Sequence, residues 1–280
     1  SDFTQQILVP FATMGRRNQP EEPPTDPSGW LLDNGLSQFL IMHTNEIKYM
    51  CMLGYTFLHG TKVFSKVPST APLSYKFISL ILACTGGGIM VPIFINSIPV
   101  PLSTDAYPVA IFASFILHNY FPILREVMRL SPLFTGLVVF LYETQRAYVV
   151  MKLTVAAGAA IPASDFAFPI FGPIFCGAIA GCGGAFLPLN KGLDPIKNGL
   201  APNMLSALFA ATFIHLFLST SLSNGIMNAA KKTHVIVALG FILFGLQQKF
   251  EIDVMDPFGK KKAAATAAAP KVKAEAKKQD

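Results

Sequence analysis

The stretch Gly183-Gly184-Ala-Phe-Leu-Pro188 places glycine and proline, the two residues that most disturb helices, inside a long apolar segment. The same pattern, Gly87-Gly88-Ile-Met-Val-Pro92, occurs 96 residues earlier in another apolar segment. Both stretches predict helices that are broken or bent at corresponding points. In lipid, the backbone groups freed at such breaks need partners from the protein or from enclosed water.

Four windows of the sequence contain no Asp, Glu, Lys or Arg: residues 77–104, 106–124, 166–190 and 198–230. A helix needs about 20 largely apolar residues to cross a membrane, and each window is close to that length or longer. Across the chain, 52% of the residues are hydrophobic and only 14% are charged, against roughly 25% charged residues in soluble domains. The composition predicts an integral membrane protein whose outer surface faces lipid.

We predict an all-α membrane protein with seven transmembrane helices. They are expected near residues 36–57, 73–97, 106–124, 132–155, 167–190, 203–223 and 233–250. Residues 1–35 form a polar, proline-rich N-terminal segment, and residues 36–250 form the transmembrane domain. Residues 251–280 form a basic, low-complexity C-terminal tail, which cannot bury a hydrophobic core.

The repetition extends beyond the glycine and proline residues. Phe112-Ala-Ser-Phe-Ile-Leu-His118 matches Phe209-Ala-Ala-Thr-Phe-Ile-His215 at an offset of 97 residues, which also relates Glu46 to Glu143. Because three helices cross a membrane an odd number of times, the second copy must enter upside down. We therefore predict two inverted three-helix repeats, helices 1–3 and 4–6, and a seventh helix, with functional sites near the middle of the membrane. Coincidental similarity between apolar segments is the alternative.

Ionisable side chains occur in the predicted first and fourth helices, where each costs about 2.5–3.5 kcal/mol on insertion scales. Glu143 and Arg146 are three residues apart, so they share a helix face and can pair. Glu46 and Lys48 are two residues apart and cannot face one another. We hypothesise that these four residues line a polar path between the two halves. A structural ion pair joining the first and fourth helices is the alternative.

The connection between the third and fourth predicted helices carries Arg125 and Arg129. Both are candidates for contact with anionic lipid headgroups; a loop that is basic only because it faces the cytosol is the alternative. The sequence has no nucleotide-binding loop, metal-binding histidine pair or nucleophile motif. We therefore expect no enzyme activity, no bound metal, no cofactor and no nucleic-acid partner.

The distribution of basic residues predicts the orientation of the chain. With the C-terminal tail in the cytosol, the loops on the same side carry Lys62, Lys66, Arg125, Arg129, Lys191 and Lys197. The chain ends in Lys277-Lys278-Gln279-Asp280, which is similar to a dilysine signal for retrieval to the endoplasmic reticulum. We expect a multi-pass protein of the endoplasmic reticulum membrane with a cytosolic C-terminus; another organelle membrane is the alternative.

The order of these features resembles the trimeric intracellular cation channels over residues 70–250. Gly177-Ala-Ile-Ala-Gly-Cys-Gly-Gly184 is similar to the glycine-rich fifth helix of that family, and Ser206-Ala-Leu-Phe-Ala-Ala-Thr-Phe213 is similar to its sixth. Gly86-Gly-Gly88 resembles its second helix. The resemblance implies two inverted repeats plus a final helix, a homotrimer, one pore in each subunit and a bound phosphoinositide lipid.

The same resemblance implies a channel for monovalent cations, chiefly potassium ions, that supplies counter-ion current during calcium release. The family carries a Lys-Glu-Val-x-x-Arg-like patch after a proline in its fourth helix. Here that proline is Pro132 and the patch is Tyr142-Glu143-Thr-Gln-Arg146, with tyrosine in the lysine position. The resemblance therefore implies that Tyr142, Glu143 and Arg146 line the pore and that Arg146 binds lipid.

Two other functions fit the same sequence. A secondary transporter would use the inverted repeats for alternating access around a site near the middle of the membrane. A non-conducting structural subunit of a membrane assembly is the other alternative, and the tyrosine in place of lysine at Tyr142 favours it.

Overall fold

The structure is a computed structural model that describes residues 26–187 and 192–250. Within these residues every regular element is a helix, as the sequence predicts. The α-helices are α1 Gly35–Leu40, α2 Asn45–Phe64, α3 Leu73–Phe94, α4 Val100–Ser103, α5 Ala106–Tyr120, α6 Ile123–Leu130, α7 Pro132–Ala160, α8 Phe171–Cys182, α9 Pro202–Ser219 and α10 Ala229–Phe250. Short 3-10 turns lie at Gly29–Leu31 (η1), Gly183–Ala185 (η2), Asp194–Ile196 (η4) and Ser221–Ser223 (η5).

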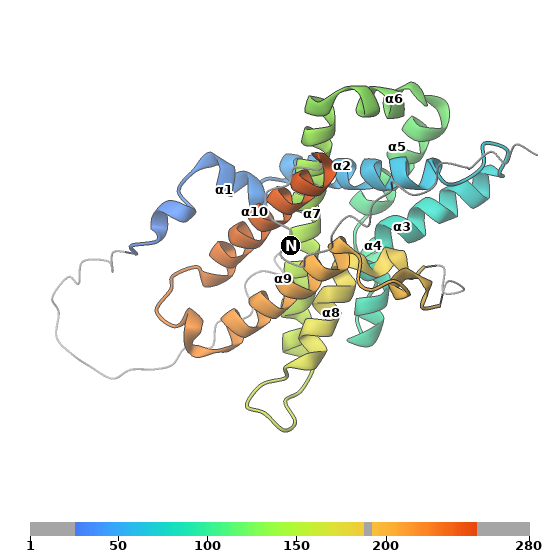
Figure 1. Cartoon of the computed structure of the whole chain (residues 1–280). Helices are drawn as coiled ribbons and strands as arrows, with labels where there is room; N and C mark the ends of the chain where they lie inside the picture. Colours follow the sequence, from blue (N-terminus) through green and yellow to red (C-terminus); the bar gives the residue numbers. More distant parts are fainter. Residues whose placement is uncertain (1–25, 188–191, 251–280) are drawn as a thin grey trace, which may run out of the picture.

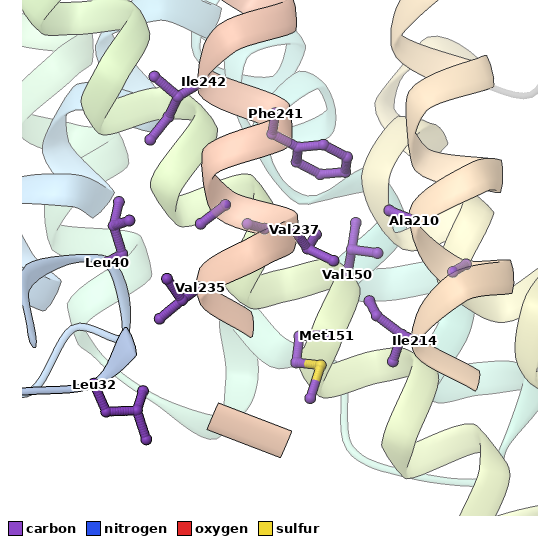
Figure 2. Close-up of a cluster of buried hydrophobic side chains, with 13 residues drawn as sticks. Leu32, Leu40, Val150, Met151, Ala210, Ile214, Val235, Val237, Phe241 and Ile242 are labelled. Carbon is purple, nitrogen blue, oxygen red and sulfur yellow. The ribbon is translucent and has the colours of Figure 1, made fainter. Parts of the chain in front are cut away.

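Helix α7 runs through the middle of the molecule, and α2, α8, α9 and α10 pack against it (Figure 1). It has 29 residues, which is about 43 Å at the usual rise per residue. Figure 2 shows the hydrophobic cluster where α7 meets α9 and α10, with Val150, Ile214 and Phe241 among its members. Leu32 and Leu40 join the same cluster, so the segment before α2 is packed onto the bundle.

Helices occupy all seven segments that the sequence assigns to the membrane, but not all of them qualify as spans. By length and composition, α3, α9 and α10 can cross a membrane. α5 and α6 together would form a fourth span, although the chain bends by 91° between them. α8 and η2 are apolar but shorter than a full span. The number of seven crossings therefore stays a prediction.

The prediction of one helix over residues 36–57 is wrong, because the chain forms two helices there, α1 and α2. Between them Met42 adopts a left-handed conformation with a φ of 52°. Thr44 then begins α2, because its side chain accepts a hydrogen bond from the N–H of Ile47 in the manner of a preferred N-cap residue. Glu46 consequently lies exposed in the first turn of α2, where the helix dipole favours a carboxylate.

The two glycine–proline stretches differ in structure. α8 ends at Cys182, and Gly183-Gly184 begins the turn η2, so the helix stops at this pair; Pro188 lies outside the described residues. α3 instead continues through Gly87-Gly88 and ends two residues after Pro92, so the expected break is absent there. A proline this close to the end of a helix removes little of its hydrogen bonding, which explains why α3 stays intact.

Glycines bring α3 against α8 and η2. A Cβ atom at Gly86 would lie 2.3 Å from the backbone nitrogen of Gly184, and one at Gly183 would lie 2.5 Å from the backbone nitrogen of Gly87. Side chains cannot fit at these distances, so the close crossing of the two stretches requires glycine. Glycine at this point permits backbone contact between helices, as it does in many membrane proteins.

Candidate functional site

Three neighbouring cavities lie within the described part of the bundle. The large cavity has a volume of about 640 Å³ and is lined by residues of α2, α3, α7, α8, η2, η4 and the start of α9. Its wall includes Tyr55, His59 and Lys62 from α2, Lys66 just after the end of α2, and Tyr142 from α7. Its volume is in the range of ligand and ion vestibules rather than of packing defects.

The constriction has a volume of about 10 Å³, enough for about one water molecule. Tyr55 and Ala180 line both the constriction and the large cavity. Val100, Tyr107 and Val149 line both the constriction and a second cavity of about 210 Å³. The constriction therefore lies next to both wider cavities and shares wall residues with each of them.

Basic side chains line both wide cavities. Lys62 and Lys66 face the large cavity, where Asp194 supplies a carboxylate. Lys48 and Lys152 line the second cavity. Among the described residues, the second cavity has no acidic side chain in its wall. A cation in that cavity would therefore depend on neutral oxygen atoms for favourable contacts.

Three aromatic side chains pack together on the wall of the large cavity. The rings of Tyr55 and Tyr142 are stacked with centroids 5.0 Å apart. The ring of His59 lies 4.7 Å from that of Tyr55 and 5.3 Å from that of Tyr142. The Lys62 ammonium lies 4.9 Å from the centre of the Tyr142 ring, within the range of a cation–π interaction. Tyr142, which the resemblance places at the pore, therefore lies on the wall of the large cavity together with a lysine from α2.

Arg146 and Glu143 form a buried ion pair next to this wall. Arg146 Nη1 lies 2.9 Å from Glu143 Oε2, and their side chains are 2% and 5% exposed. Arg146 Nε donates to the carbonyl oxygen of Gly181 at 3.1 Å, and Nη2 donates to Ser206 Oγ at 2.8 Å and to the carbonyl oxygen of Asn203. One guanidinium group thus joins α7 to α8 and α9. Neither charged side chain lines any of the three cavities.

Helix α10 covers another side of the ion pair. The Arg146 guanidinium lies 4.3 Å from the centre of the Phe241 ring. A Cβ atom at Gly245 would lie 2.8 Å from the Glu143 side chain, so glycine allows α10 to approach the carboxylate. The pair therefore holds α7 to α8, α9 and α10. The structural ion pair that the sequence offered as an alternative was instead expected to join the first and fourth predicted helices.

Gln145 on α7 contributes to the wall of the second cavity. Its Nε2 donates a hydrogen bond to Tyr107 Oη at 2.8 Å. Its Oε1 is buried and has no hydrogen-bond partner within residues 26–187 and 192–250. Because Tyr107 lines both the second cavity and the constriction, this pair lies beside both of them.

The two charged residues expected in the middle of the first helix lie near the start of α2 instead. Glu46 is exposed and lines none of the three cavities. Lys48 is half-buried and lines the second cavity. The structure therefore does not bring Glu46 to Glu143, because the break between α1 and α2 moves the helix start to residue 45.

The arginines between the third and fourth predicted helices lie on α6 rather than in a loop. Arg125 Nη1 donates to the carbonyl oxygen of His118 at 2.5 Å, which satisfies a backbone group at the end of α5. Arg129 is exposed and forms an ion pair with Glu126 at 3.0 Å. Contact of Arg129 with lipid stays a prediction, and Arg125 has a structural partner within the protein.

Sequence analysis did not single out Tyr55, His59, Tyr107 or Gln145 as functional residues. Gln145 gave a signal, because an uncharged polar side chain inside a buried helix needs a partner. The three aromatic residues gave none, because aromatic side chains are common in membrane helices. No group of three or more His, Cys, Asp or Glu side chains that could hold a metal ion occurs in the described part of the chain.

In the described part of the chain, the fold is all-helical, contains apolar helices long enough to cross a membrane, and encloses three neighbouring cavities. No protein-family model and no curated protein matches the sequence. A trimeric intracellular cation channel from C. elegans, solved in the absence of Ca²⁺, matches the structure with a TM-score of 0.57. The match covers 82% of this chain and 97% of that chain, at 17% sequence identity. The chain therefore has the fold of that channel, and the resemblance seen in the sequence is confirmed at the level of the fold.

Proposed function

We propose that this protein is a monovalent cation channel of an intracellular membrane and that ions cross it through the three cavities. The observation that carries the proposal is the shared walls: Tyr55 joins the large cavity to the constriction, and Tyr107 joins the constriction to the second cavity. The proposal joins the three cavities into one path inside a single chain. The fold shared with a cation channel supports the same function. Potassium as the main ion and counter-ion current during calcium release belong to the proposal.

The described conformation is a closed one. A volume of about 10 Å³ in the constriction holds about one water molecule, whereas a hydrated potassium ion is larger. Ala180 stands at the entrance to the constriction, three residues before the turn Gly183–Ala185. Movement of α8 at this turn would carry Ala180 away from Tyr55 and widen the path.

Two sets of contacts support the inverted repeats. The glycine stretches cross reciprocally, with Gly86 against Gly184 and Gly183 against Gly87. The two histidines also take matching positions: a Cβ atom at Gly60 in α2 would lie 2.1 Å from His118, and one at Gly158 in α7 would lie 3.6 Å from His215. These contacts fit an arrangement in which α2, α3 and α5 correspond to α7, α8 and α9. Seven crossings and a homotrimer complete the proposed architecture.

Two lysines at the end of α2, Lys62 within the helix and Lys66 just after it, are the proposed contacts for a phosphoinositide headgroup in the large cavity. The resemblance expects a lysine at the position of Tyr142, and the Lys62 ammonium stands 4.9 Å from the centre of that ring. Lys66 lines the same cavity. Arg146 already makes four hydrogen bonds within the protein. Lys62 and Lys66 are therefore better placed than Arg146 to bind phosphate groups.

In the proposed orientation, the protein lies in the endoplasmic reticulum membrane with its C-terminal tail and its basic loops in the cytosol. The position of the end of α10 supports this arrangement. It lies next to the start of α7, because a Cβ atom added at Gly136 would lie 3.9 Å from the Phe250 ring. α6, with Arg125 and Arg129, leads into that end of α7. α10 therefore ends on the same side of the bundle as the basic connection, which fits the positive-inside rule.

Recording from purified protein in planar bilayers tests the proposed function. We expect unitary potassium currents that stop when potassium is replaced by a large organic cation. The nearly closed constriction between two cavities also fits a transporter with alternating access. Saturable uptake coupled to protons or sodium ions, without unitary currents, would support the transporter. Protein that neither conducts nor transports and that co-purifies with other membrane chains would support a structural subunit.

A further inference from the structure

Two lysines in the wall of the second cavity have no carboxylate that balances their charge. Lys48 is half-buried in the first turn of α2, and Lys152 lies on α7. Three ion pairs occur within residues 26–187 and 192–250, and neither lysine belongs to one of them. Ionisable groups inside a membrane protein are costly without a partner, so this cavity calls for a counter-charge that comes from outside the chain.

The contacts of the two ammonium groups place them beside the cavity. Lys48 Nζ donates a long hydrogen bond of 3.5 Å to Asn45 Oδ1, and Asn45 lines the same cavity. Lys152 Nζ lies 6.0 Å from the centre of the Tyr148 ring, and Tyr148 also lines it. An ammonium group has three donors. Among the described residues, these contacts leave most of the donors available to a ligand in the cavity.

The starts of two helices add to the positive potential of the second cavity. The first turns of α2 and α5 both contribute to its wall, through Asn45 and Tyr107 among others. The N-terminus of a helix carries partial positive charge and favours an anion. The carboxylates closest to these turns in the sequence, Glu46 and Asp105, are exposed and line none of the three cavities.

The second cavity has the size and the hydrogen-bond donors for a small oxyanion. Its volume of about 210 Å³ is several times the ~30 Å³ of a water molecule but below the roughly 300 Å³ of the smallest pockets for drug-sized ligands. Thr104 Oγ1 accepts a hydrogen bond from the N–H of Ala106 at 3.2 Å, so its own hydroxyl can donate to a ligand. Asn45 Oδ1 accepts from Lys48, which leaves the N–H₂ group of that amide as a donor. Two ammonium groups and two neutral donors suit the oxygens of a phosphate group.

We propose that Lys48 and Lys152 bind a phosphate group in the second cavity, supplied by free inorganic phosphate or by the headgroup of an anionic lipid. This site goes beyond the proposed channel function. It is separate from the phosphoinositide contacts proposed for Lys62 and Lys66, which line the large cavity. A bound phosphate group offsets both ammonium charges, so the cavity no longer repels the cations of the proposed channel. Lysines that only extend toward water at the membrane surface would need no ligand.

Binding of radiolabelled inorganic phosphate is measured by equilibrium dialysis on the full chain, purified in detergent. A second arm measures by native mass spectrometry how much phosphatidic acid stays on protein taken from vesicles that contain this lipid. Each arm compares the wild type with Lys48→Gln, Lys152→Gln, their double variant and the conservative Lys152→Arg. The matched control combines Lys231→Gln with Lys249→Gln, which removes two charges from exposed positions of α10 that line none of the three cavities.

We expect each single glutamine variant to weaken phosphate binding about tenfold, because it removes one charged contact. The double variant loses this binding, while Lys152→Arg and the control retain it within about threefold. Dependence on both lysines in dialysis identifies free phosphate as the source, and the same dependence in mass spectrometry identifies a lipid headgroup. Elution in detergent verifies that each variant is folded.

Three results would overturn the inference: wild-type protein that binds neither phosphate nor phosphatidic acid, unchanged binding in the folded single variants, or a loss that is equally large in the control. The single variants keep the test decisive even where the double variant fails to fold. Because no current is recorded, this inference and the proposed channel function fail separately.

Discussion

Arg146 Nη1 lies 2.9 Å from Glu143 Oε2 in the middle of α7, and both side chains are almost fully buried. Ionisable groups inside a membrane span usually meet either enclosed water or a partner. Here the partner is one helical turn away, and the remaining guanidinium donors reach α8 and α9. The pair therefore stabilises the bundle around the cavities, whose walls are formed by uncharged side chains, lysines and Asp194.

Removing one member of the pair is expected to destabilise the protein strongly. Arg146→Met leaves the Glu143 carboxylate buried without its partner, which costs about 3–5 kcal/mol. The double variant Arg146→Met with Glu143→Gln removes both charges and should recover most of that loss. Thermal unfolding in detergent measures both effects. A double variant no more stable than Arg146→Met alone would contradict the role of the pair.

The crossing of α3 and η2 predicts a position-specific effect of a single methyl group. Gly86→Ala would place a Cβ atom 2.3 Å from the backbone nitrogen of Gly184, so the helices must separate at a cost of about 1–3 kcal/mol. Gly240→Ala on α10 is the control, because no atom lies within 4 Å of its added Cβ, and it should gain about 0.5–1 kcal/mol. Equal melting temperatures for the two variants would show that the close crossing is not required.

Segment 26–41 is held to α10 by a contact that depends on pH. Asp26 Oδ2 accepts a hydrogen bond from Lys232 Nζ at 2.5 Å, and Oδ1 accepts one from Ser28 Oγ at 2.8 Å. The bond from Lys232, followed by that from Ser28, lowers the pKa of Asp26 below its ordinary value of 3.8. A carboxyl group whose pKa is lowered by folding stabilises the fold above that ordinary value and loses this effect as the pH falls through its folded pKa.

Asp26→Asn should therefore lower the melting temperature at pH 6, and the difference from the wild type should shrink as the pH falls below 3.8. Melting temperatures of both proteins across this range are the measurement. A difference that stays constant with pH would mean that the charge of Asp26 does not contribute.

Lys62 is expected to control the concentration of cations in the large cavity. Lys62→Gln removes a positive charge from the wall, so potassium current should rise at low salt and the difference should shrink as salt screens the charge. The same variant should bind more weakly to vesicles that contain phosphoinositide. Lys231→Gln, an exposed lysine at the start of α10, serves as the control. Current and vesicle binding equal to those of the control would exclude Lys62 from the path.

The positions of most helices could be predicted because charge-free windows of about 20 residues leave a chain few other structures in lipid. The prediction missed the start of α2 because Thr44 carries no local signal that distinguishes it from other polar residues. Its role as the N-cap residue depends on the left-handed turn at Met42. α6 was taken for a loop because it is short and carries three charged residues.

The site was harder to predict than the fold because its contacts join residues far apart in the sequence. Lys62 and Tyr142 meet across α2 and α7, and Gln145 meets Tyr107 across α7 and α5. No local pattern encodes such pairs. Glu143 and Arg146 were found because their spacing of three residues is a local signal, and the structure shows them paired.

The native cysteine Cys182 gives the most direct test of the central claim that ions pass through the cavities. It lines the large cavity, whereas Cys51 and Cys176 line none of the three. A positively charged methanethiosulfonate reagent, added during single-channel recording, should attach to Cys182 and reduce the unitary potassium current in steps. Cys182→Ala should abolish the reduction. Unchanged current in protein whose Cys182 is shown by mass spectrometry to be modified would contradict the account, because ions would then cross elsewhere.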